Sequence, residues 1–141
     1  MLSGRLIMKH KILIVDDEEE VRQTIQLQLK DTGMEVIEAE DGEKGIALLD
    51  SENALDVDVI ICDVRMPKIN GVEAVAYFRR EYPAIPVIVL TGFPDAKLAT
   101  DFMKQGAFDY LVKPVEKEAL IDVVTKAAGQ RHSGGGSGMI V

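Results

Sequence analysis

The stretch ILIVDDEEE, from Ile12 to Glu20, sets four apolar residues directly before five acidic ones. The apolar run is typical of a short strand that is buried on both faces of a sheet. Neighbouring carboxylates repel one another, so the acidic residues must either lie in water or share a cation. Which of the two applies depends on what the chain brings beside the end of this strand.

Short apolar runs alternate along the chain with segments of helical period. The predicted strands cover residues 11–15, 35–39, 57–62, 86–90 and 108–112, each followed by a predicted helix, the last over about 116–128. This alternation predicts an α/β fold, a doubly wound five-stranded parallel sheet with helices on both faces. The more polar second strand suits an edge. With right-handed crossovers, the strand order 2-1-3-4-5 meets these constraints.

Polar residues follow several of these strands. In a doubly wound sheet, ligands bind at the carboxyl ends of the strands, where the strand order reverses. Here that point lies between the first and third strands, so Asp16 and Asp17 face Asp63 across about 4.8 Å. Thr91 and Lys113 add a hydroxyl and an ammonium group at the ends of the fourth and fifth strands. Because carboxylates and phosphate oxygens suit Mg2+, the set predicts a place where a phosphoryl group is transferred and held.

Each of these residues also has an ordinary structural interpretation. The paired aspartates suit a helix cap and a solvated turn, and the hydroxyl and ammonium groups suit a strand end and a surface charge. Glu18, Glu19 and Glu20 are expected only to favour the start of a helix, and Cys62 is expected to be a small buried side chain. The functional interpretation therefore rests on the whole set of strand ends that meet in one crevice.

Composition excludes several classes of function. The net charge of -8 disfavours nucleic-acid binding, which needs Lys and Arg to neutralise phosphates. A single cysteine forms no internal disulfide and no apolar run could cross a membrane, so a cytoplasmic protein without membrane contact is expected. We interpret residues 1–8 as a leader or cloning remnant, 9–131 as the folded domain, and the Gly/Ser-rich 132–141 as a flexible linker or artificial tail.

Four stretches together resemble the receiver domain of two-component response regulators, in the CheY-like superfamily: ILIVDDEEEVR, VIICDVRMPKINGVE, VIVLTG and GAFDYLVKP. The likeness covers nearly all of residues 9–128 with matching spacing. It implies a flavodoxin-like (βα)5 fold and a phosphoacceptor signalling domain that is not an enzyme. It also implies that Asp63 accepts a phosphoryl group from a sensor histidine kinase or a phosphotransfer protein.

The resemblance extends to the cofactor and to the lifetime of the modification. Mg2+ would be held directly by Asp17, largely through water by Asp16, by Asp63, and by the backbone carbonyl of Arg65. Small phosphodonors would also phosphorylate the domain, and the phosphoryl group would be lost slowly. Arg65 and Phe93 would modulate that loss, because Phe93 cannot orient a water and Arg65 offers donors only.

The resemblance implies a switch as well. Thr91 and Lys113 would contact the phosphoryl oxygens, Tyr110 would turn inward as Thr91 moves, and the bond before Pro114 would be cis. Gly71 would allow the tight turn after the third strand. The output surface would be formed by the fourth helix, fifth strand and fifth helix, and would control an output domain or partner. A phosphorylation-dependent dimer is compatible with this arrangement.

Three other classes stay open on the residues alone. A flavodoxin-like mononucleotide binder needs a phosphate loop rich in Gly, Ser or Thr after the first strand, where DDEEE repels phosphate instead. A hydrolase that forms an aspartyl-phosphate wants a second acid two residues after its nucleophile, where this chain has Arg65. A purely structural interaction module would take up no phosphoryl group.

Overall fold

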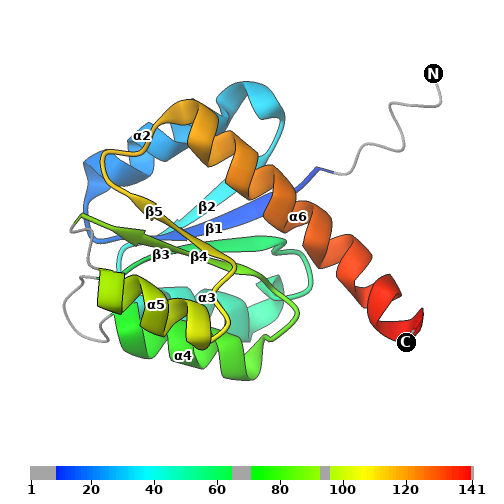
Figure 1. The fold of residues 1–141 in the computed structure, drawn as a ribbon. Coiled ribbons are helices and arrows are strands. Elements are labelled where there is room, and N and C mark those ends of the chain that lie inside the picture. The colour runs from blue at the N-terminus through cyan, green and yellow to red at the C-terminus, as the bar shows by residue number, and fades with distance from the viewer. Residues whose placement is uncertain (1–8, 65–70, 93–95, 141) are drawn as a thin grey trace, which may run out of the picture.

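A computed structural model describes residues 9–64, 71–92 and 96–140. Figure 1 shows one sheet between two layers of helices. The strands are β1 (Lys11–Val15), β2 (Glu35–Ala39), β3 (Val59–Asp63), β4 (Val87–Thr91) and β5 (Asp109–Val112). The α-helices are α2 (Glu19–Leu29), α3 (Gly42–Leu48), α4 (Gly71–Glu81), α5 (Ala96–Lys104) and α6 (Lys117–Ile140). Two short segments, the 3-10 helix η1 (Lys30–Thr32) and the π-helix η2 (Leu49–Asn53), follow α2 and α3.

The sheet confirms the predicted topology. Its five strands are parallel and lie in the order β2-β1-β3-β4-β5. Helices α2 and α6 cover one face, and α3, α4 and α5 cover the other (Figure 1). The three central strands are buried along almost their whole length, whereas the edge strands β2 and β5 consist mainly of half-buried and exposed residues. The reversal of strand order therefore lies between β1 and β3, as predicted.

Local signals in the sequence explain where the first helices begin and end. Gly33 follows η1 with φ 81°, a left-handed conformation that ends a helix at little cost to glycine. Asp41 caps α3 by accepting a hydrogen bond from the Lys44 amide at 2.8 Å. Gly45 lets α3 approach β1 closely, because a Cβ there would lie 2.9 Å from Val15 Cγ2. These contacts hold α3, which follows β2, against β1, the strand that precedes the acidic residues.

Two separate apolar cores hold the helices on the sheet. Successive side chains of a strand point to opposite faces, so Leu13 and Val15 enter one core and Ile12 and Ile14 enter the other. The core under α3, α4 and α5 contains the largest buried side chains, including Phe78. The other core lies under α2 and α6. Burial on both faces makes the strands a rigid frame for whatever their ends carry.

Helix α6 is longer than predicted. It continues to Ile140, whereas we expected it to end near Ala128 and to be followed by a flexible linker. Glycine costs about 1 kcal/mol per residue in a helix, yet it keeps the N–H donor that proline lacks, and no proline follows Pro114. The domain boundary at residue 131 stays a prediction. Neither α6 nor any other helix of the described residues combines the length and apolarity needed to cross a membrane.

Candidate functional site

The register of the sheet sets the site residues side by side. Because Val15 of β1 pairs with Cys62 of β3, Asp16, which directly follows β1, lies beside Asp63, the last residue of β3. Thr91 ends β4. Lys113 follows β5 and its amide donates to the Thr91 carbonyl at 2.7 Å. The carboxyl edge of the sheet thus carries two acids, a hydroxyl and an ammonium group.

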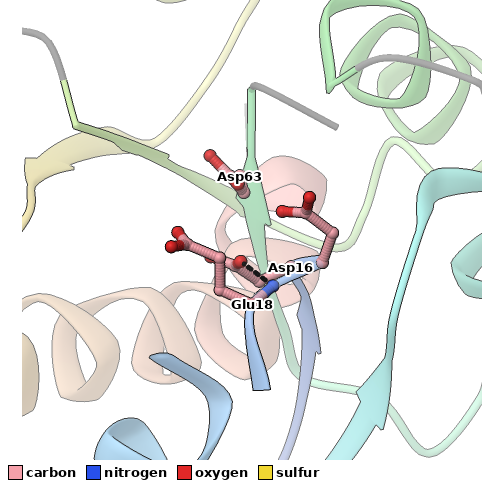
Figure 2. A group of neighbouring side chains, drawn as sticks. Asp16, Glu18 and Asp63 are labelled. Carbon is pink, nitrogen blue, oxygen red and sulfur yellow. Dashed lines mark hydrogen bonds between the residues drawn. The ribbon is translucent and has the colours of Figure 1, made fainter. Parts of the chain in front are cut away.

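Four carboxylates converge at this edge. Asp16, Asp17, Glu18 and Asp63 each offer an oxygen, and these oxygens all lie within 4.8 Å of one another. Figure 2 shows how Asp16 and Glu18, after β1, approach Asp63 at the end of β3. Asp16 is fully buried and Asp63 is 2% exposed, whereas Asp17 and Glu18 are exposed. The predicted meeting of Asp16, Asp17 and Asp63 is observed, and their roles stay predictions.

Lys113 is the positive charge in contact with three of these carboxylates. Its Nζ lies 3.0 Å from Asp16 Oδ2, 2.9 Å from Glu18 Oε1 and 3.3 Å from Asp63 Oδ2. Burial by itself would lower the pKa of Lys113, but its hydrogen bond to Glu18 and its contacts with the negative charges of Asp16 and Asp63 outweigh burial and raise it. Burial raises the pKa of Asp16 despite the backbone hydrogen bond from Glu18 and the nearby Lys113. One cation is therefore set against more negative charge than it neutralises.

Glu18 was misjudged from the sequence. It precedes α2 but makes no side-chain cap; its carboxylate instead contacts Lys113. The Glu18 amide donates to Asp16 Oδ1 at 2.8 Å, so Asp16 also forms the tight turn that its ordinary interpretation predicted (Figure 2). That two-residue spacing was the available signal, because such a turn brings Glu18 back toward the end of the strand.

The other predicted positions are partly described. Thr91 is 6% exposed at the rim, and Tyr110 on β5 is 38% exposed. The peptide bond between Lys113 and Pro114 is cis, as the resemblance implied. Three predictions lie outside the described residues: those for Arg65, for Phe93 and for the turn before Gly71.

Cys62 takes no part in the site. It is fully buried directly before Asp63, as predicted for a small apolar side chain. Burial raises the pKa of its thiol well above the ordinary range, so the thiol stays protonated. A protonated thiol is neither a nucleophile nor a good metal ligand. The chemistry of this edge is therefore that of oxygen and nitrogen groups.

The donor set fits a hard divalent cation. Asp16 Oδ2 is buried, and within the described residues it accepts no well-directed hydrogen bond, although Lys113 lies near it as an ion pair. Mg2+ prefers oxygen ligands and is usually held by one or two carboxylates together with water and phosphate oxygens. A cation at this point would offset the repulsion among the acids and leave the Asp63 oxygens beside a second positive charge.

A doubly wound sheet with an acidic, lysine-bearing site at its carboxyl edge defines the class of CheY-like α/β domains. The family model for the response regulator receiver domain matches residues 12–125. The chain belongs to this family, the receiver domains of two-component response regulators. The match favours the receiver interpretation over the mononucleotide binder and the aspartyl-phosphate hydrolase considered above.

Individual relatives agree with this assignment. The transcriptional regulatory protein GlrR of Escherichia coli (strain K12) is 37% identical over 129 residues, which cover 87% of this chain but only 28% of GlrR. A receiver domain protein from Clostridium thermocellum has a TM-score of 0.81 at 36% identity, covering 87% of this chain and 97% of that one. For the chemotaxis protein CheY4 of Vibrio cholerae the TM-score is 0.77 at 33% identity, with coverages of 85% and 99%.

Proposed function

We propose that the chain is the phosphoacceptor of a two-component system and that Asp63 receives the phosphoryl group. The observation that carries the proposal is the position of Asp63. It ends the central strand β3, is almost fully buried, and lies 3.3 Å from Lys113 among three further carboxylates. The donor would be a phosphohistidine of a sensor histidine kinase or a phosphotransfer protein, and we expect both to meet in the cytoplasm.

The proposed step is a displacement at phosphorus. An oxygen of the Asp63 carboxylate attacks the phosphorus, and an O–P bond forms as the N–P bond of the phosphohistidine breaks. The leaving imidazole nitrogen keeps the electron pair and takes up a proton. Because the step gathers negative charge on the transferring oxygens, it needs positive groups already in place. Lys113 is such a group, since it lies at the same rim with 16% of its side chain exposed.

The second positive group would be Mg2+. The residues that would hold it are Asp16, Asp17 and Asp63, with the Arg65 carbonyl as a further ligand and Glu18 close by. When bound, Mg2+ neutralises charge that develops on the transferring phosphoryl oxygens. The carboxylates themselves keep the site empty of other anions, because they repel any phosphate that is not delivered with a cation.

Phosphorylation would then change contacts at the strand ends. It adds about two negative charges and several acceptor oxygens to Asp63. Lys113 can exchange its contact with Glu18 for these oxygens, and the Thr91 hydroxyl can donate to them from the end of β4. In the sequence, Thr91 is followed by α5, and Lys113 lies between β5 and α6. We propose that α5, β5 and α6 form the output surface, with Tyr110 following Thr91.

Output is proposed by class only. The chain spans about a quarter of the length of relatives such as GlrR, a transcriptional regulator by name. The partner of the α5-β5-α6 surface would accordingly be an output domain or a separate protein. A dimer formed through this surface on phosphorylation is compatible with the proposal.

The proposal is tested with a small phosphodonor. Wild-type protein treated with acetyl phosphate and Mg2+ should gain about 80 Da, the mass of one phosphoryl group. Asp63→Asn should gain nothing, because the amide lacks the nucleophilic oxygen, while Asp58→Asn, at the opposite end of β3, should be modified like wild type. A mass gain in Asp63→Asn, or none in the wild type, would refute the assignment.

A further inference from the structure

Arg22 joins the acidic turn, residues 16–18, to the edge strand of the sheet. Its side chain leaves the second turn of α2 and is only 14% exposed. Its Nη1 donates to the Asp16 carbonyl oxygen at 2.7 Å, and its Nε donates to Glu38 Oε1 at 2.7 Å. One planar guanidinium thus holds a backbone oxygen of the turn and a carboxylate of β2 at the same time.

Asp16 is held at each of its polar atoms. Its amide donates to Ala39 of β2 at 3.1 Å, and its Oδ1 accepts from Glu18. Its Oδ2 lies 3.0 Å from Lys113 Nζ, and its carbonyl oxygen accepts from Arg22. Arg22 is the side chain that holds this carbonyl oxygen, and it does so from helix α2, outside the group of four carboxylates.

The direction of that carbonyl sets the direction of the next residue. The carbonyl belongs to the planar peptide unit that links Asp16 to Asp17, so fixing the oxygen fixes where the Asp17 backbone begins. The Asp17 side chain is exposed, and its carboxylate nevertheless lies within the four-carboxylate group. An exposed side chain keeps such a position only if its backbone is held, because loop residues move readily.

We propose that Arg22 is a positioning residue: it holds the acidic turn so that the Asp17 carboxylate stays with Asp16 and Asp63 in the group that binds Mg2+. The inference rests on the proposed function, since it concerns the cation of the same site. Glu38 supports the arrangement because Gln26 also donates to it, which fixes the acceptor that orients the guanidinium. A lysine at position 22 could reach one of the two acceptors but not both.

Charge and position predict opposite effects for this residue. Arg22 is a cation near the carboxylates, so if only its charge mattered, removing it would strengthen Mg2+ binding by relieving repulsion. If it holds the turn, removing it lets Asp17 leave the cluster and weakens binding. The sign of the change therefore separates the two.

The first measurement is calorimetric titration of Mg2+ into the full chain and its variants. Arg22→Met should lower the Mg2+ affinity about tenfold, a loss typical of residues that orient metal ligands. Arg22→Lys should lose less, because it keeps one donor. Lys44→Met is the matched control: Lys44 lines the same groove and pairs with Glu40, so its loss removes equal charge and should leave the affinity unchanged or slightly higher. An Arg22→Met protein that binds Mg2+ as tightly as wild type, or more tightly, overturns the inference.

A second measurement needs no metal. In EDTA, hydrogen exchange at the Glu18 amide, which donates to Asp16 Oδ1, should be faster in Arg22→Met than in wild type and unchanged in Lys44→Met. If wild type binds no Mg2+, the proposed function fails, and faster exchange still supports the positioning role while unchanged exchange overturns it. If Arg22→Met does not fold, Arg22→Lys and Glu38→Gln take its place, with the same direction expected in both measurements.

Discussion

Both ends of the sheet bury an aspartate, but they compensate it differently. At the amino end, Asp58 is 6% exposed; its Oδ2 accepts from the Lys11 amide at 2.9 Å and lies 3.5 Å from His10 Nδ1. Its own amide donates to the Lys11 carbonyl at 2.8 Å, so the carboxylate extends the pairing of β1 with the start of β3. The carboxylate of Asp58 is therefore compensated by its neighbours in the chain at the start of β1, the Lys11 amide and the His10 imidazole.

At the carboxyl end, Asp16 and Asp63 share Lys113 with a third carboxylate. The negative groups outnumber the cation that contacts them, and that cation is on a long side chain that can move. Burial alone therefore does not mark a functional carboxylate, since Asp58 is about as buried as Asp63. What distinguishes the functional carboxylates is that their negative charge is only partly compensated, because this leaves the site able to bind a metal ion and a charged ligand.

The largest effect should follow from removing the shared cation. Lys113→Met leaves two buried carboxylates without their positive partner, so the free energy of unfolding in EDTA should fall by about 2 kcal/mol, less than for a fully buried pair because Lys113 is partly solvated. Urea unfolding measures this. A variant as stable as wild type would mean that the carboxylates do not depend on Lys113, and the contrast with Asp58 would be lost.

The same substitution at the two ends should act in opposite directions. In EDTA, Asp58→Asn should lower the free energy of unfolding by about 1 kcal/mol, because a charge-assisted hydrogen bond to the Lys11 amide becomes a neutral one. Asp63→Asn should raise it by about 1 kcal/mol, because it relieves repulsion among the acids. Urea unfolding of the two variants measures both changes. If the free energy of unfolding changed in the same direction in both, the two ends of the sheet would not compensate their aspartates differently.

A smaller effect is expected at the exposed part of the acidic group. Asp17→Ala should raise the free energy of unfolding in EDTA by less than about 0.5 kcal/mol, since exposed charges interact weakly. Added Mg2+ should raise the melting temperature of wild type but not of this variant, because a bound ligand stabilises only a protein that binds it. If the variant gains as many degrees as wild type does, Asp17 is not a ligand.

The last test concerns the lifetime of the modification. Phe93 has no polar atom to orient a water, so we expect it to shield the phosphoryl group on Asp63. After the donor is removed, Phe93→Ala should lose phosphate faster than wild type, by well under the roughly hundredfold that a positioned base supplies. Decay at the wild-type rate would rule out shielding by Phe93.

The fold and the core of the site were predictable because they depend on periodicity and on strand ends. Strict alternation of strands and helices gave the parallel order, and parallel strands necessarily bring Asp63, Thr91 and Lys113 to one edge. Glu18 and Arg22 were missed because their roles depend on side-chain directions in a turn. The two-residue spacing to Asp16 indicates the direction of Glu18, but its partner is a lysine 95 residues away, which no local pattern identifies. The end of α6 was missed because glycine penalises a helix without forbidding it.

The partition of the apolar interior bears on how the sequence can change over generations. Among the described residues, the two cores have no side chain in common, since the sheet lies between them. Substitutions around Phe78 and around Leu120 should therefore add in their effects, because the two positions share no partner. Drift on one face needs no matching change on the other, and helices from a relative could be recombined one face at a time. Only the strands are constrained by changes on both faces, because their successive side chains point into the two cores in turn.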